Sequence, residues 1–351
     1  MHMSLTDLKK VAWKAMAGGY KLSGMPRIRH RGTVVILTYH RVLTSQELAE
    51  QIVQPGMYVL DDVFEMHATY LKKHFHVLAF DELLERWQRG KWDHAQAYCV
   101  ITFDDGWLDN YRNAAPILKR ADLPATVFLP TDFIGSNRWF WPERLSFILR
   151  HADSDAVSPE RRNRLYTKIA KTTGDPIHQW DERQNKAAGN VVGYDDVIER
   201  FKQIEYGLLE SILAELTELI EIAVPENRVL INWQEVREMS AQNISFGSHS
   251  RSHRLLTLLT EKDIAREAIG SYEQLKDSGA AVTPVFCYPN GNYDAKAKHA
   301  VMNAGYRAAV SCDAGMETDI PSDIFALRRI TMHQDICSTP ALFSLALSGF
   351  R

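Results

Sequence analysis

The stretch Ile101-Thr102-Phe103-Asp104-Asp105-Gly106 places two adjacent carboxylates at the end of an apolar run. Residues 98–103 are apolar, β-branched or aromatic, which predicts a buried strand. Gly106 permits a sharp exit from that strand, so the two aspartates are expected at its C-terminal end rather than within it. Carboxylates that close repel each other unless a cation or a shared proton relieves them. The pair therefore raises the question of a metal site in this chain.

Short β-rich runs alternate with helical patterns on both sides of this stretch. Strands separated by helices of about ten residues or more favour a parallel sheet, and about seven such units favour a barrel. We therefore expect an α/β fold, specifically a distorted, incomplete (β/α) barrel of about seven parallel strands. The alternation stops over residues 138–232, where charge and helical leucine spacing predict a helical insertion. The expected parts are an arm at 1–32, a body at 33–137 and 233–351, and this insertion.

The charge of the chain is concentrated near its start. Residues 1–32 contain four Lys and three Arg against one Asp, about +6, whereas the whole chain carries −3. The remainder, at about −9, is not a nucleic-acid binder by charge. No run approaches the roughly 20 apolar residues of a membrane span, and no signal-peptide core is present. The four cysteines lack a Cys-x-x-Cys pair and indicate free thiols in a reducing compartment. We therefore expect a cytoplasmic protein.

The arm has helical spacing of apolar residues, with lysines off the apolar line. The apolar positions are Leu5, Leu8, Ala12, Ala15 and Met16. Such a basic amphipathic helix could lie on the inner face of an anionic membrane. The simpler alternative, a helix that packs on the body with its basic face in solvent, is the one the sequence favours.

Chemically distinctive residues follow several of the predicted strands directly. They are His40, Asp104 with Asp105, His249 with His253, and Pro289 with Asn290. In a parallel α/β fold these positions share one face, where loops converge on a site. Two histidines four apart and one aspartate could bind zinc or another divalent ion and leave a position open for water. Each motif alone is weak, because paired surface histidines and Asp-Gly turns are common. Their placement after strands of one body favours a site.

Three motifs carry a resemblance to a known family. They are Thr-Phe-Asp-Asp-Gly at 102–106, Ser-His-Ser-Arg-Ser-His at 248–253 and Phe-Cys-Tyr-Pro-Asn-Gly at 286–291. The chain resembles the polysaccharide deacetylases of carbohydrate esterase family four, the NodB-homology group, over most of residues 33–335 outside the insertion. The resemblance implies that Asp104 is the general base and that Asp105, His249 and His253 bind one divalent metal, zinc above all. It also implies that Tyr288, Pro289 and Asn290 contact the substrate, with the Asn290 backbone N–H facing the oxyanion.

Two departures from the family pattern leave alternatives open. Many members have arginine where this chain has Cys287, and Arg329 looks like the arginine that related branches place elsewhere; a surface charge at a strand end is its equal alternative. The general acid is either His333, late in the chain, or His40. Residues 36–42 resemble the early strand and histidine of the permuted-motif branch, which includes biofilm poly-N-acetylglucosamine deacetylases. We prefer His40, because it directly follows a strong strand.

The expected function is hydrolysis of the acetamide of an N-acetylated sugar to acetate and a free amine, in exopolysaccharide, capsule or lipopolysaccharide synthesis. The substrate is expected to be a saccharide linked to a lipid or a nucleotide. An O-acetyl esterase, an amidase acting on a non-carbohydrate substrate and a catalytically silent sugar-binding protein are the alternatives. Residues 138–142, Arg-Trp-Phe-Trp-Pro, could stack on sugar rings, but packing in a core is the simpler interpretation.

Overall fold

Seven parallel strands form a closed ring in the computed structural model, which describes residues 5–51, 53–54, 56–174 and 194–349. Residues 1–4 of the expected arm and 175–193 of the expected insertion lie outside these ranges. The strands are β1 (Val34–Tyr39), β5 (Tyr98–Phe103), β6 (Ala125–Leu129), β7 (Ile244–Ser248), β8 (Val282–Cys287), β9 (Ala308–Ala314) and β10 (Leu327–Thr331). The short β4 (His76–Val77) pairs only with β5. The prediction of a distorted α/β barrel of about seven parallel strands is confirmed, but the barrel is closed rather than incomplete, because β1 also pairs with β5.

The ring closes where β1 pairs with both β5 and β10. Six residue pairs join β1 to β5, from Val34 opposite Tyr98 to Tyr39 opposite Phe103. Only two join β1 to β10, and the register shifts between β10 and β9. A second register shift lies between β7 and β8, so the distortion of the barrel occurs on both sides of the ring.

Both faces of the central strands are buried, which explains their continuous apolar sequence. Every residue of β1 and β5 is buried. Val35 and Leu37 belong to one hydrophobic cluster, while Val34 and Ile36 belong to another. Successive side chains of a strand point to opposite faces, so each strand contributes to two apolar layers.

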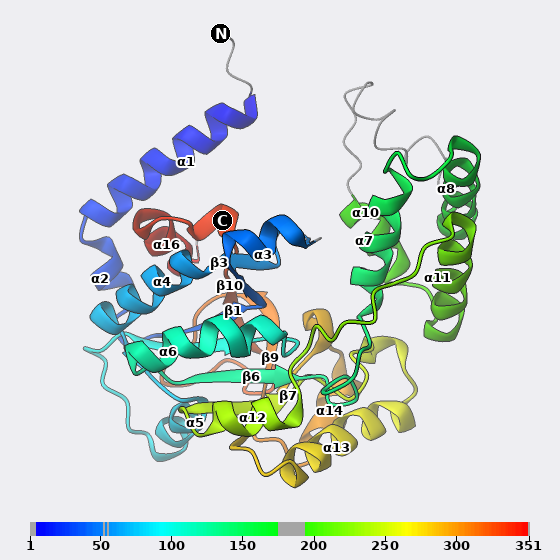
Figure 1. Cartoon of the computed structure of the whole chain (residues 1–351). Coiled ribbons are helices and arrows are strands. Elements are labelled where there is room, and N and C mark those ends of the chain that lie inside the picture. Colours follow the sequence, from blue (N-terminus) through cyan, green and yellow to red (C-terminus); the bar gives the residue numbers. More distant parts are fainter. Residues whose placement is uncertain (1–4, 52, 55, 175–193, 350–351) are drawn as a thin grey trace. The chain divides into compact units, whose positions relative to one another are not determined.

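Helices surround the strands (Figure 1). They are α4 (Asp61–His74), α5 (Phe80–Arg89), α6 (Ala115–Ala121), α12 (Trp233–Ser240), α13 (Glu261–Asp277), α14 (Ala295–Asn303) and α16 (Pro340–Leu347), with the short α3 (Ser45–Glu50) and α15 (Gln334–Cys337). A π-helical turn at Asn110–Ala114 and 3-10 turns at Leu256–Leu258 and Pro289–Gly291 complete them. The small parallel sheet of β2 (Arg41–Leu43) and β3 (Tyr58–Leu60) was not anticipated, because three-residue strands carry too little periodicity to be recognised.

The arm forms helices α1 (Leu5–Leu22) and α2 (Met25–Arg29). Trp13, Ala17 and Tyr20 share one face of α1 and pack with Leu342 and Leu345 of α16. The expected packing of an arm helix on the body therefore occurs on this face. Among the helices described, none combines the length and hydropathy needed to cross a membrane.

A second compact unit comprises residues 51–54 and 137–227. Its helices are α7 (Trp141–Ala152), α8 (Pro159–Thr173), α10 (Tyr194–Phe201) and α11 (Tyr206–Ile220). Leu209, Leu213 and Leu216 of α11 are buried together with Leu145 and Leu165. The leucine spacing of α11 thus forms a helical core face, although Leu208 at its start is exposed.

Candidate metal centre and active site

Asp104 and Asp105 lie just beyond the C-terminal end of β5, and both are buried, with 2% and 4% of their surfaces exposed. The chain turns there with positive φ angles of 74° at Asp105 and 68° at Gly106. A Cβ atom at Gly106 would lie 2.6 Å from Cδ2 of Leu129, so only glycine fits without movement of that side chain. The turn directs the two carboxylates to different partners.

Asp105 lies against the two histidines of the Ser-His-Ser-Arg-Ser-His motif. Its Oδ1 atom is 3.5 Å from Nε2 of His249 and 3.2 Å from Nε2 of His253. One ligand atom from each residue lies within 4.8 Å of the others, which is close enough to hold one ion. His249 follows β7, and the loop to His253 has positive φ at Ser250 and His253. This backbone conformation brings two histidines four residues apart to one carboxylate oxygen.

The contacts of these three side chains fit a divalent metal. The indole Nε1–H of Trp107 donates to Oδ2 of Asp105 at 3.0 Å, whereas Oδ1 is buried with no hydrogen-bond partner among the described residues. Burial alone would raise the pKa of Asp105, but the neighbouring His253, His40 and His249 lower it below its usual value. A buried, ionised oxygen that faces two ring nitrogens is the donor arrangement that a cation completes.

His249 has the orientation and protonation expected of a ligand. Its Nδ1–H donates to the backbone oxygen of Cys287 at 2.8 Å, which leaves Nε2 directed at Asp105. Burial, together with the nearby His253, lowers the pKa of His249 to about 4. The ring is therefore neutral at pH 7, as metal binding requires.

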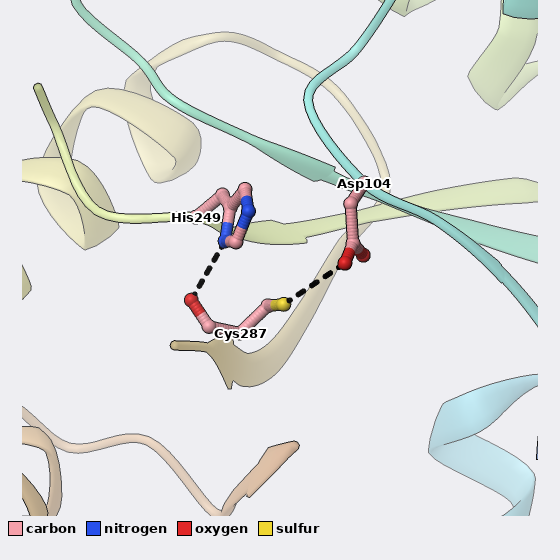
Figure 2. Close-up of side chains that lie close together, drawn as sticks. All are labelled: Asp104, His249 and Cys287. Atoms are coloured by element: carbon pink, nitrogen blue, oxygen red, sulfur yellow. Dashed lines mark hydrogen bonds between the residues drawn. The ribbon is translucent and has the colours of Figure 1, made fainter. Parts of the chain in front are cut away.

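A second group of possible ligands, Asp104, His249 and Cys287, lies close by (Figure 2). Burial raises the pKa of the Cys287 thiol well above its usual value, so the thiolate needed for coordination is not available. Both oxygens of Asp104 already accept hydrogen bonds from Arg329, and Nδ1 of His249 is engaged with the Cys287 backbone. The Asp105 group is therefore the better metal site.

Arg329 of β10 forms a buried, two-pronged ion pair with Asp104. Its Nη1 and Nη2 atoms donate to Oδ1 and Oδ2, each at 2.8 Å, and its Nε donates to the backbone oxygen of Ser311 at 2.8 Å. Burial alone would raise the pKa of Asp104, but Arg329, together with His249 and His40, lowers it below its usual value. Arg329 is thus not a surface charge. It pairs with the first aspartate, and the thiol of Cys287 lies 3.2 Å from its Nη2.

Of the two candidate acids, His40 is the one whose charge acts on the two carboxylates. His40 lies between β1 and β2, and its positive form lowers the pKa of both Asp104 and Asp105. Its Nδ1 is buried without a hydrogen-bond partner in the described chain. His333 instead follows β10 and lies 3.6 Å from Asp335. The electrostatic contacts therefore couple His40 to the carboxylate pair.

The loop after β8 places its three predicted substrate residues differently. Tyr288 is fully buried, and its hydroxyl donates to the backbone oxygen of Phe325 at 3.0 Å, so its side chain belongs to the hydrophobic core rather than to a substrate surface. Pro289 is also buried. Asn290 is exposed, with a φ angle of 56°, and its side chain donates to Asn292. Asn290 is the residue of the three that can meet a ligand.

A supporting network around Trp107 was not recognised from the sequence. The guanidinium of Arg41 lies over the Trp107 ring, 4.6 Å from its centroid, and its Nε is 2.9 Å from Oδ2 of Asp109. Asp109 also accepts the backbone N–H of Val42. These contacts fix the indole that holds Asp105. In the sequence, this network is indicated only by the position of Trp107, directly after the Asp-Asp-Gly turn.

The fold and the site define a (β/α) barrel whose strand ends hold a carboxylate–histidine group able to bind metal beside a separate carboxylate–arginine pair. The chain belongs to the polysaccharide deacetylase family, whose model matches residues 92–170 and 211–309, just over half of the chain. These segments contain Asp104 and all three residues of the metal group, Asp105, His249 and His253. His40 and Arg329 lie outside them.

Two curated relatives match shorter segments. YxkH of Bacillus subtilis, a protein named for the same family, is 40% identical over 93 residues, covering 23% of this chain and 33% of that protein. The poly-beta-1,6-N-acetyl-D-glucosamine N-deacetylase of Staphylococcus epidermidis is 31% identical over 117 residues, covering 31% of this chain and 40% of that protein. The chain therefore spans less than half the length of these relatives.

Solved structures share the fold. The deacetylase PplD of Streptococcus pyogenes and IcaB of Ammonifex degensii each have a TM-score of 0.55 and 16% identity, and each comparison covers 89% of this chain and 97% of the other. A polysaccharide deacetylase of Bacillus cereus has a TM-score of 0.53 and 18% identity, covering 90% of this chain and 69% of the other. At this level of identity, the likeness to PplD and IcaB shows a shared fold.

Proposed function

We propose that this chain is a metal-dependent N-deacetylase that hydrolyses the acetamide of an N-acetylated saccharide to acetate and a free amine. One observation carries the proposal: a carboxylate paired with a buried arginine, Asp104, stands beside a carboxylate that faces two imidazoles, Asp105. Hydrolysis of an unactivated amide needs both an electrophilic centre and a base. The two neighbouring aspartates can supply these separately.

Asp105, His249 and His253 would hold the metal, with zinc the first choice for a ligand set of two imidazoles and one carboxylate. When bound, a divalent ion lowers the pKa of its water toward about 7 and polarises the acetyl carbonyl. Trp107 and the backbone of Cys287 orient two of the three ligands.

The remaining residues handle protons and charge. Asp104 takes the proton of the attacking water, and its lowered pKa keeps it ionised at neutral pH. Arg329 holds both oxygens of that carboxylate and so positions it. His40 gives a proton to the departing amine nitrogen, and the backbone N–H of Asn290 stabilises the oxyanion. His40 is preferred to His333 as the acid because its charge acts on both aspartates.

The substrate class follows from family membership, and the named activity of the Staphylococcus epidermidis relative supports a polymer of N-acetylated hexosamine. We place the reaction in the synthesis of an exopolysaccharide, capsule or lipopolysaccharide, on a lipid-linked or nucleotide-linked saccharide. Acetate release should be measured on matched N-acetyl and O-acetyl saccharides. Release from the O-acetyl compound alone would replace this proposal with an esterase, and release from neither would leave a silent sugar-binding protein.

The metal requirement has a separate test. Purified protein should contain about one divalent ion per chain, and His253→Ala should lose both the ion and acetate release. His299→Ala removes an exposed histidine of α14 and should change neither. Full activity of the His253→Ala variant would end the metal-dependent proposal.

We also propose that the arm contacts an anionic membrane surface. Leu22 and Ile28 are 89% and 67% exposed, and Met16 and Met25 are exposed beside them. These apolar side chains lie in a segment of about +6 charge, the combination that favours anionic lipid. The four unpaired cysteines support the cytoplasmic face of that membrane.

Vesicle flotation tests the arm. The protein should float with vesicles containing phosphatidylglycerol and remain behind with phosphatidylcholine alone. Leu22→Ser combined with Ile28→Ser should abolish flotation, whereas Ile320→Ser, which removes an equally exposed side chain near β10, should not. Equal flotation of all three proteins, or equal binding to both lipids, would contradict membrane contact through this arm.

A further inference from the structure

A cavity of about 510 Å³ lies within the unit of residues 137–227. Three segments line it: the connection that leads into α7 together with the first turn of that helix, the first turns of α11, and the stretch that follows α11. All of its lining residues belong to this one unit, so the cavity is separate from the residues of the metal centre. Its volume is within the range of about 300–1,000 Å³ typical of small-molecule sites.

Trp139 gives the cavity an aromatic wall. Its side chain is half-buried, whereas its neighbour Phe140 is buried and Trp141 packs against the core of the unit. The indole Nε1–H donates to the backbone oxygen of Asn227 at 3.2 Å, and the ring meets Phe147 edge to face at 5.9 Å between centroids. The indole is therefore fixed in place and its polar atom is satisfied. What it still offers a ligand is the flat surface of the ring.

The cavity also contains a polar group, the ion pair of Arg144 and Glu210. Nη1 of Arg144 lies 2.5 Å from Oε2 of Glu210, which is on the same helix as Tyr206. The hydroxyl of Tyr206 is hydrogen-bonded with Glu210 and with Arg138. These contacts hold planar donors and acceptors in place, so a ligand meets groups that are already ordered.

The charges of the lining cancel. Two arginines and two glutamates, the second being Glu226, contribute no net charge. An anionic or cationic ligand would gain nothing from this balance. A wholly apolar ligand would remove water from the Arg144–Glu210 pair and offer no hydrogen bonds in its place. A neutral molecule with both C–H faces and hydroxyl groups can stack on Trp139 and also form hydrogen bonds with Arg144 and Glu210.

We propose that this cavity binds a neutral saccharide, with one sugar ring stacked on Trp139 and its hydroxyl groups paired with Arg144 and Glu210. The inference rests on the proposed function in one respect, because the saccharide is taken to be of the same class as the substrate whose acetamide is hydrolysed.

Calorimetric titration tests this inference with the full-length Asp104→Asn protein, in which turnover is blocked. The ligand is a β-1,6-linked hexamer of N-acetylglucosamine, and the monomer serves for comparison. Adding Trp139→Ala should weaken hexamer binding about fivefold or more, whereas Trp139→Phe should retain most of it. Leu208→Ala is the matched control, because this exposed leucine lies on α11 but outside the lining. Its binding should equal that of the parent.

Acetate release by the wild-type protein separates the two proposals. Failure of the wild type to release acetate from any N-acetyl saccharide would overturn the proposed function, while the titration would still report on the cavity. Unchanged hexamer binding in Trp139→Ala, equal weakening in Leu208→Ala, or no hexamer binding by the parent would overturn the cavity proposal.

Discussion

Two arginine–carboxylate pairs, one in each compact unit, show how burial changes the consequence of the same chemistry. In the barrel, Arg329 and Asp104 have 0% and 3% of their side chains exposed. In the helical unit, Arg144 and Glu210 have 23% and 36% exposed. Water cannot replace a lost partner at the first pair but can at the second. The barrel pair is therefore suited to holding a catalytic carboxylate in one charge state, and the other pair to meeting a ligand.

The removal of Arg329 should produce the largest effect. Arg329→Met leaves Asp104 buried and unpaired, which should cost about 3–5 kcal/mol of unfolding free energy. Because burial raises the pKa of Asp104 and Arg329 is the main group that lowers it, this pKa should rise in the variant. The acid limb of the activity profile should then shift to higher pH. Urea unfolding and a pH–rate profile would show both effects.

Arg329→Lys is the matched variant, because it keeps the charge but loses the two-pronged geometry. It should shift the acid limb less than Arg329→Met. An unchanged profile in the Met variant would mean that Asp104 is not the base.

Trp107→Phe should have the next largest effect, on the metal rather than on the base. It removes the indole donor to Oδ2 of Asp105 and should weaken metal affinity about 10–100-fold. Trp92→Phe removes a comparable indole hydrogen bond, to the backbone of Gly32, away from the site. Competition with a chelator should therefore distinguish the two variants, and equal affinities would remove Trp107 from the supporting network.

Acid should destabilise the barrel through its buried histidines. Burial lowers the pKa of His30, His67 and His249 to about 4. A histidine with a lowered folded-state pKa stabilises the fold above its unfolded value of about 6.5, and this contribution is lost as pH falls toward 4. Each histidine should contribute about 1.4 kcal/mol per pH unit to that loss.

His30→Phe tests the pH-dependent contribution of one of these three histidines. Neither ring nitrogen of His30 has a hydrogen-bond partner in the described chain, and the ring packs beside Phe75. The variant should therefore keep its stability at pH 7.5 and lose about 1.4 kcal/mol less per pH unit below pH 6. Urea unfolding of metal-free protein at several pH values would measure the slope. A slope equal to that of the wild type would contradict the assignment.

The smallest effect is expected from Arg144→Met, which completes the comparison of the two ion pairs. Since both partners are partly exposed, the variant should lose at most about 1 kcal/mol of unfolding free energy. A loss as large as that of Arg329→Met would mean that the helical unit depends on a buried charge in the same way as the barrel.

Local sequence was sufficient for most strands and for the residues of the metal group. The strand at 98–103 has the predicted bounds. A run of apolar residues predicts the position of a strand, and the residue that follows the run must lie at the strand end. The same logic predicts that Asp105, His249 and His253 share one face of the barrel.

Contacts between distant segments were harder to predict. The partial burial of Trp139 beside the fully buried Phe140 was not anticipated, because the side of a helix start that faces the core depends on the neighbouring helices. The role of Tyr288 as a core residue was missed for a similar reason. Its place in a family motif says where the backbone goes and not where the ring packs.

The Asp104–Asp105 stretch shows what the sequence decided and what the tertiary structure decided. The sequence by itself determined a buried strand that ends in two carboxylates and a glycine turn, since these depend on residue types a few positions apart. Only the tertiary structure decided how the pair is divided. Closure of the ring brings β10 to β1, beside β5, so that Arg329 reaches Asp104 across 225 residues of chain while Asp105 faces the histidines. Periodicity cannot encode that meeting, because it depends on which strands become neighbours when the barrel closes.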